Sequence, residues 1–235
     1  MGQLNTVAFS HNELAKLDVC GVSGLAVFYL SMSKAIDVAL SLEHADPDRL
    51  AVTGLSGGGW QTIIISSLDT RVKLAVPVAG HSALGQRIAN RSSIGDLEQN
   101  PNDLGAFADY VHLNTLMVPR PLLLIYNTKD NCCFVASTVK ANTYEPVIPF
   151  YAQANVPERL HYHENSDPGD HNYQLDNRQQ LYAFLETHFF PERNLSAKEI
   201  DCDAEIFTHE DLIVPLPNAN ENFHTLATNA VKSIE

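Results

Sequence analysis

Short apolar runs that end in glycine or polar turns alternate with segments of helical pattern along the middle of the chain. The apolar runs span residues 49–53, 73–78, 120–126 and 159–163. Runs of this length, without alternating polar positions, are typical of parallel strands buried on both faces. The pattern therefore predicts a sheet of about four parallel strands.

Helical patterns occupy the intervals between these runs. Helices are expected over residues 22–44, 60–68, 104–116, 144–155 and 173–189, with a short one near 223–231. The first is so apolar that we expect it to be buried on most sides. Residues 81–102 show no periodicity and are expected to form a loop. Strands alternating with helices predict an α/β fold, a mostly parallel sheet with helices on both faces.

The first predicted strand leads directly into Gly54-Leu55-Ser56-Gly57-Gly58, which fits the pattern G-x-S-x-G. A serine on a sharp turn between a strand and a helix is held in strained geometry with its hydroxyl exposed. Small residues at Gly54 and Gly58 would let the strand and helix approach closely. The amide of Gly57, at the start of the helix, is expected to donate to an oxyanion. The pattern predicts Ser56 as a nucleophile.

A glycine-rich turn that binds phosphate is the alternative at this position. A phosphate-binding P-loop carries a lysine after its last glycine, whereas Trp60 and Gln61 follow here. We therefore favour the nucleophile and expect Trp60 to lie at the substrate site.

A serine nucleophile needs a base, and the base needs an orienting carboxylate. In hydrolases with this turn the chain order is serine, acid, histidine. Asp130 comes just after the third predicted strand, and His171 follows the fourth, in the loop before the last long helix. Asp69 and Asp109 are rival acids, but the first ends the helix after Ser56 and the second is expected on a helix. We predict Asp130 as the acid and His171 as the base.

Other histidines have different expected places. His81 follows the second strand and is expected to line the pocket, although it precedes the predicted acid. His161 and His163 lie within one strand and point to one face, so we expect them to pack or cap. Together with the Asp167/His171 pair they could suggest a metal site, but no spacing matches a strong zinc motif. No metal is expected.

Several segments together resemble bacterial α/β-hydrolases of the acetyl xylan esterase and dienelactone hydrolase kind. The matching segments are residues 46–49 (Asp-Pro-Asp-Arg), 54–62, 120–131 and 167–172. The glycine that follows the serine motif also resembles the catalytic domain of prolyl-oligopeptidase-like enzymes, whose motif is G-x-S-x-G-G. The resemblance covers about residues 20–190.

This resemblance implies Ser56 as nucleophile, Asp130 as acid, His171 as base and no cofactor. It implies a catalytic core over residues 1–190, with residues 191–235 as an extension on the surface. In this fold several strands precede the serine, and an early loop supplies a second oxyanion donor. The residues before Ser56 show neither feature. We therefore expect the N-terminal part of the fold to be missing, which leaves an open sheet edge.

Three hypotheses about function remain open. The first is a serine esterase acting on a small-molecule or carbohydrate ester, with a short acyl group on a sugar preferred. The second is a peptidase of the prolyl-oligopeptidase kind, and the third is an impaired or non-catalytic binding module. The net charge of −13 argues against a nucleic-acid partner.

The chain ends and cysteines add little. The first 20 residues lack a basic segment followed by an apolar one, so no signal peptide is expected. The chain as it stands is therefore expected to be cytoplasmic. Secretion stays open if the natural chain is longer at its N-terminus. Residues 25–42 are too polar to span a membrane. Cys132 and Cys133 are expected as two free thiols, while a Cys20–Cys202 bridge is left open. The oligomeric state is also open.

Overall fold

The computed structural model describes residues 10–101, 104–193, 198–215 and 217–233. Four parallel strands form its central sheet: β1 (Ala51–Leu55), β2 (Leu74–Val78), β3 (Leu122–Asn127) and β4 (Leu160–Asn165). They lie side by side in the order in which the chain makes them. All four predicted strands are confirmed, with their ends moved by no more than two residues.

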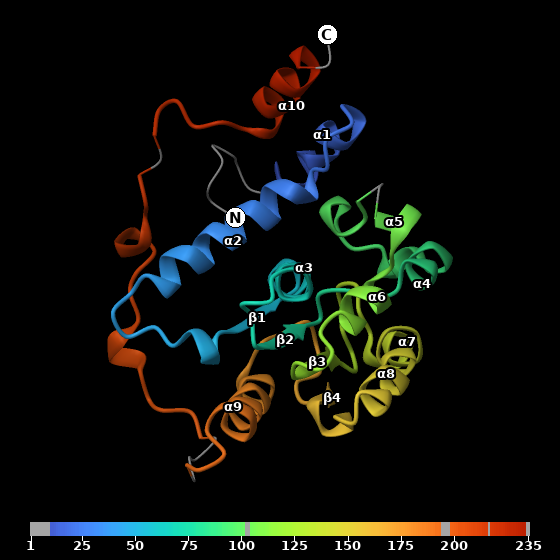
Figure 1. Ribbon diagram of the computed structural model, residues 1–235, viewed down its shortest axis with the longest axis vertical. Coiled ribbons are helices and arrows are strands. Elements are labelled where there is room, and N and C mark those ends of the chain that lie inside the picture. The colour runs from blue at the N-terminus through green and yellow to red at the C-terminus, as the bar shows by residue number, and fades with distance from the viewer. Residues whose placement is uncertain (1–9, 102–103, 194–197, 216, 234–235) are drawn as a thin grey trace.

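Helices cover both faces of the sheet, as the alternating pattern predicts (Figure 1). On one face α9 (Leu175–Phe189) packs through Phe184 against a cluster that includes Val76 of β2. The preceding residue of β2, Ala75, belongs to the larger cluster beneath α3 (Gly57–Leu68). Successive side chains of a strand point to opposite faces, so Val76 and Ala75 pack against different helical layers.

The first long helix, α2 (Leu25–Leu40), is less buried than we expected from its composition. Phe28 and Ile36 are buried, but Leu30 is 64% exposed and Val38 is 57% exposed. The expectation that this helix is buried on most sides is therefore wrong. The helix lies outside α3, so only one of its faces has a neighbouring layer to pack against (Figure 1).

The segment expected to be a loop, residues 81–102, is folded over most of its described length, and that expectation is wrong too. It contains α4 (Leu84–Ala89) and two 3-10 turns, η3 (Arg91–Ser93) and η4 (Leu97–Gln99). Arg87 organises it: its buried guanidinium donates to the carbonyl and the side-chain oxygen of Gln99. Such tertiary contacts leave no hydrophobic period in the sequence.

Further short helices precede and follow β3 in the chain. They are α5 (Leu104–Phe107), α6 (Tyr110–Thr115), α7 (Ala136–Val139) and α8 (Ile148–Gln153). The helix expected over 104–116 is divided because Asp109 caps the start of α6 with its side chain. The remaining turns are η1 (Ser10–Leu14), η2 (Pro47–Arg49), the π-helical η5 (Lys140–Tyr144), η6 (Glu145–Val147), η7 (Pro157–Arg159), η8 (Asp203–Glu205) and η9 (Glu210–Leu212).

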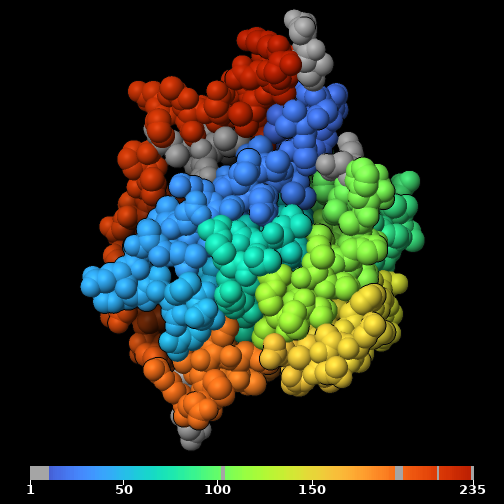
Figure 2. Space-filling model, in the orientation of Figure 1, coloured from blue at the N-terminus to red at the C-terminus, as the bar shows by residue number. Residues whose placement is uncertain are grey.

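The C-terminal segment runs along one side of the molecule and ends in α10 (Phe223–Lys232), which packs against α1 (Ala15–Val19) (Figure 2). The predicted short helix is thus confirmed. Phe223 is buried, with its ring centroid 6.2 Å from that of Phe28, whereas residues 198–215 are exposed. In the part of the chain that the structure describes, no helix combines the length and apolar character needed to cross a membrane.

Candidate active site

Ser56 lies on the turn between β1 and α3, where the sequence predicts the nucleophile. Its backbone has φ 57° and ψ −120°, a conformation that side-chain-bearing residues rarely adopt. Two hydrogen bonds hold this turn: the Ser56 N–H donates to the Val78 carbonyl of β2, and its carbonyl accepts from the Trp60 N–H, each at 2.9 Å. The strained turn is therefore fixed from both sides.

Glycines allow α3 to lie directly against the strands. A Cβ added to Gly54 would lie 2.7 Å from the carbonyl carbon of Gly58, and one on Gly59 would lie 2.5 Å from the Val78 carbonyl oxygen. On Gly80, after β2, a Cβ would lie 2.3 Å from Gly59. At Gly58, by contrast, a Cβ would meet nothing within 4 Å. The sequence predicts that Gly58 must lack a side chain, but in the structure Gly59 and Gly80 have no room for one.

Asp130 and His171, which are distant in sequence, form a carboxylate–imidazole pair. His171 Nδ1 lies 2.8 Å from Asp130 Oδ2, and the Asp130 side chain is fully buried. The other oxygen, Oδ1, accepts from the backbone N–H groups of Cys132 at 2.9 Å and Cys133 at 3.0 Å. Burial alone would raise the pKa of Asp130, but the His171 hydrogen bond and these amides lower it below its ordinary value. The carboxylate is therefore charged at neutral pH.

This pairing determines which ring nitrogen of His171 is available for chemistry. A charged Asp130 only accepts hydrogen bonds, so Nδ1 carries the proton between them, and Nε2 is the nitrogen with the lone pair in the neutral form of the ring. Nε2 is buried and has no hydrogen-bond partner among the described residues. The backbone N–H of His171 donates to Asn131 Oδ1 at 3.0 Å, which fixes the loop to the Asp130 turn.

Ser56, Asp130 and His171 follow the C-terminal ends of β1, β3 and β4. The C-terminal ends of parallel strands share one edge of the sheet, the usual position of ligands and catalytic groups in open α/β sheets. The described hydrogen bonds join Asp130 to His171, and none of them joins His171 to Ser56. The role of each residue stays a prediction.

The rival acids have structural partners. Asp69 pairs with Arg71 at 2.6 Å, and this hydrogen bond lowers the pKa of the Asp69 carboxyl. Asp109 caps α6 and also accepts from the Leu84 N–H at 2.9 Å. Neither carboxylate pairs with an imidazole among the described residues. Of the three candidate acids, Asp130 is the one paired with a histidine.

His81 and Trp60, which were expected near the substrate, are both fully buried. Trp60 Nε1 donates to the Tyr110 hydroxyl at 2.8 Å. His81 Nε2 lies 3.1 Å from Asn114 Oδ1, and because the Asn114 amide nitrogen donates to a carbonyl, Oδ1 is left to accept from the ring. Burial lowers the pKa of His81 to about 3, so the ring is neutral. A direct contact of either ring with substrate stays a prediction.

The two histidines of β4 have structural partners: His163 pairs with a carboxylate of α9, and His161 bonds the turn before the strand. His163 Nε2 lies 2.7 Å from Asp176 Oδ2 on α9, and His161 Nε2 lies 2.8 Å from the Glu158 carbonyl oxygen. All four cysteines are free, which confirms the two thiols at 132 and 133 and excludes the bridge between 20 and 202.

The sequence did not indicate Asn165, which shapes the His171 loop from the end of β4. Its Nδ2 donates to the Asp167 carbonyl and its Oδ1 accepts from the Gly169 N–H, both at 2.9 Å. The Gly169 carbonyl in turn accepts from the backbone N–H of Lys129 at 2.8 Å, next to the predicted acid. The loops after β3 and β4 are thus cross-linked. The sequence feature that could have indicated this role is an asparagine shortly after the fourth predicted strand.

Comparison with known protein families matches residues 31–191 to the prolyl oligopeptidase family. This region runs from α2 to the end of α9 and contains all three predicted catalytic residues. The match covers more than half of the 235 residues. No curated protein matches the chain.

Three solved structures with a similar fold are esterases by name. "Methylesterase BT1017" has a TM-score of 0.64 at 18% identity, covering 90% of this chain and 48% of its own. A glucuronoyl esterase from Solibacter usitatus has a TM-score of 0.55 at 14% identity, with 72% and 50% covered. A family 15 carbohydrate esterase, a glucuronoyl esterase from Caldicellulosiruptor kristjansonii, has a TM-score of 0.54 at 17% identity, with 77% and 55% covered.

The chain spans about half the length of these solved structures. At such low identity the likeness shows the fold, and it agrees with the parallel sheet and the strand–turn–helix around Ser56. Together with the family match, the observed architecture identifies an α/β-hydrolase. The chain belongs to the prolyl oligopeptidase family.

Proposed function

We propose that this chain carries the catalytic groups of a serine hydrolase that cleaves carboxylic esters, with Ser56 as nucleophile, His171 as base and Asp130 as acid. The observation that carries this proposal is the buried Asp130–His171 hydrogen bond, at the sheet edge where Ser56 occupies its strained turn. A charged carboxylate, an oriented imidazole and a partly exposed serine on a strained turn are the parts that this chemistry needs.

The proposed reaction has two halves. Ser56 Oγ attacks the ester carbonyl carbon while His171 Nε2 takes its proton, and the tetrahedral intermediate then expels the alcohol, which receives that proton. The acyl group is left as an ester on Ser56. A water molecule attacks this ester and gives one proton to Nε2, which returns it to Ser56 Oγ as the acid leaves. Asp130 stabilises the transient imidazolium without taking its proton.

The Gly57 amide, at the N-terminus of α3, is the proposed donor to the oxyanion. The 12-residue helix behind it adds a favourable dipole. Residues 10–50, which precede β1, form helices and turns and contain no strand followed by a donor loop. Loss of one oxyanion donor costs about 100-fold or more in turnover. We therefore expect slow turnover from these residues alone.

An ester is favoured over an amide as substrate because the similar folds belong to proteins named as esterases, two of them for glucuronoyl esters. We propose an ester with a carbohydrate part, such as a short acyl ester of a sugar. A peptidase is the second candidate, because the matching family is the prolyl oligopeptidase family. Short p-nitrophenyl esters compared with p-nitroanilides of dipeptides that end in proline would separate the two.

The decisive experiment compares p-nitrophenyl acetate hydrolysis by the unaltered chain, by Ser56→Ala and by Ser92→Ala, which changes an exposed serine elsewhere. Ser56→Ala is expected to lower kcat/KM by at least about 1,000-fold relative to the unaltered chain. A fluorophosphonate probe should label Ser56 alone, as mapped by mass spectrometry. Equal rates for all three proteins, or no labelling of a folded sample, would overturn the proposal and favour a non-catalytic module.

A further inference from the structure

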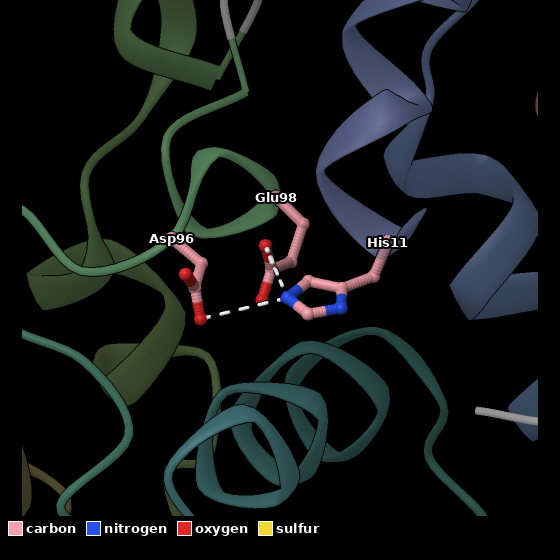
Figure 3. A group of neighbouring side chains, drawn as sticks. All are labelled: His11, Asp96 and Glu98. Atoms are coloured by element: carbon pink, nitrogen blue, oxygen red, sulfur yellow. Dashed lines mark ion pairs between the residues drawn. The ribbon is translucent and has the colours of Figure 1, made fainter. Parts of the chain in front are cut away.

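A second cluster of ionisable side chains joins two turns that are far apart in sequence. His11 lies on η1, while Asp96 and Glu98 lie at η4, and Figure 3 shows both carboxyl groups directed toward the imidazole. His11 Nε2 lies 3.6 Å from Asp96 Oδ2 and 3.8 Å from Glu98 Oε2. One potential ligand atom from each residue lies within 4.8 Å of the other two.

Glu98 is the unusual member of this cluster. Its side chain is fully buried, and neither of its carboxylate oxygens has a hydrogen-bond partner in any other described residue. Burial raises the pKa of its carboxyl group. The nearby cation, Arg87, directs its terminal nitrogens to oxygens of Gln99 and Asn100 instead. A buried carboxylate without donors is costly unless a cation offsets it.

The separations within the cluster fit an ion between the groups better than direct contact. A hydrogen bond from an imidazole to a carboxylate spans about 2.7–3.2 Å, so distances of 3.6 and 3.8 Å are too long for one. Two ligands that each lie about 2.1 Å from one metal ion, at a tetrahedral angle, lie about 3.4 Å apart. A hydrogen bond of 2.7 Å from the Leu97 N–H to Asn12 Oδ1 holds the two turns together beside the cluster.

We propose that His11, Asp96 and Glu98 bind a divalent transition-metal ion, zinc or manganese. One imidazole nitrogen with two carboxylate oxygens suits these ions, whereas calcium and magnesium prefer oxygen ligands throughout. The ion neutralises Glu98 and clamps η1 onto η4. This departs from the expectation of no metal, because ligands so far apart in sequence form no recognisable spacing.

The test is a titration of ZnCl₂ and, separately, MnCl₂ into the full chain after treatment with a chelator, followed by calorimetry. We expect one saturable site, and a rise in Tm of about 5 °C once the ion is at about 100 times Kd. Glu98→Gln and Asp96→Asn should each weaken binding at least tenfold. His209→Ala, which removes an exposed histidine, should leave it unchanged.

Two results would overturn the proposal: no saturable binding of either ion to the folded chain, or unchanged affinity in both acid variants. Asp96 is half-exposed, so its variant is expected to fold even if changes at the buried Glu98 do not. Cobalt gives a second readout, because Co²⁺ at this site should show visible absorption that Asp96→Asn abolishes. Both measurements are independent of ester hydrolysis, so failure of the triad proposal leaves the test intact.

Discussion

Two buried ionisable side chains near the sheet edge, Asp130 and His81, have opposite charge states because their partners differ. Asp130 has backbone donors and the His171 ring around it, so its carboxyl stays charged despite burial. His81 has one neutral amide partner, and burial holds it in the uncharged form. Ionisation in a protein interior thus follows the number of partners as much as depth.

Asp130→Asn should reduce kcat/KM for p-nitrophenyl acetate by about 1,000–10,000-fold, because an amide at this position favours the wrong tautomer of His171. Its oxygen can still accept from Cys132 and Cys133, so Tm should change by only a few degrees. Asp37→Asn, at an exposed pair with Arg71, is the matched control and should retain full activity. Retention of full activity by Asp130→Asn would exclude it as the catalytic acid.

His81 should make the protein less stable in mild acid. The folded-state pKa is about 3, below the ordinary value of 6.5, so the unfolded chain takes up a proton between these pH values and the folded chain does not. The free energy of unfolding should therefore fall as pH drops below 6.5, by about 1.4 kcal/mol per pH unit from this group. Above pH 6.5 the group has no effect.

Urea unfolding at pH 7.5 and pH 5.0 measures this loss. In His81→Gln, whose amide can still donate to Asn114, the difference between the two pH values should be smaller by about 2 kcal/mol. His209→Gln, at an exposed histidine, should behave like the unaltered chain. An identical pH dependence in His81→Gln and in the unaltered chain would show that the ring is not kept neutral.

Among the helices and strands, the sequence best predicts those whose conformation is determined by their own residues. The four strands could be found because each is a short apolar run with glycine or polar residues after it. Ser56, Asp130 and His171 could be placed at one edge because each follows such a strand. The turns η1 and η4 could not be paired, and α4 was missed, since long-range contacts of Arg87 and His11 organise them. Helix breaks at side-chain caps such as Asp109 were missed for a similar reason.

The close contact between α3 and the strands can be tested by comparing alanine substitutions at two glycines, Gly80 and Gly58. In Gly80→Ala the new Cβ would lie 2.3 Å from backbone atoms of Gly59 and Trp60, so the helix must move, at a cost of about 3 kcal/mol of stability. Gly58→Ala meets nothing within 4 Å and should gain up to about 1 kcal/mol from helix propensity. Urea unfolding of both variants checks this contrast, and equal stabilities would contradict the close approach.

At the scale of the whole molecule, the main core extends beyond the sheet to the far ends of the described chain. Leu14 and Leu17 from the start and Phe223 and Ala227 from α10 belong to the same apolar cluster as the side chains beneath α3. Residues 198–215, between α9 and α10, are exposed, whereas Phe223 and Ala227 of α10 are buried in the core. A region expected to be an extension therefore also supports the fold.

Phe223→Ala should destabilise the protein by about 3 kcal/mol or more, because it removes a buried aromatic ring beside Phe28. Phe207→Ala, in the same segment but 69% exposed, should change stability by less than about 0.5 kcal/mol. Thermal and urea unfolding compare the two. Equal effects of the two substitutions would mean that α10 does not pack on the core in solution.

The order of the strands, β1 to β4 from one side of the sheet to the other, has a consequence for how the protein is made. During synthesis each new strand can add to the edge left by the one before it, without waiting for a later partner. The serine turn is complete after β2, which supplies Val78, but His171 emerges only after β4. A growing chain is thus expected to hold a shaped but unreactive serine until β4 and the loop that carries His171 have left the ribosome.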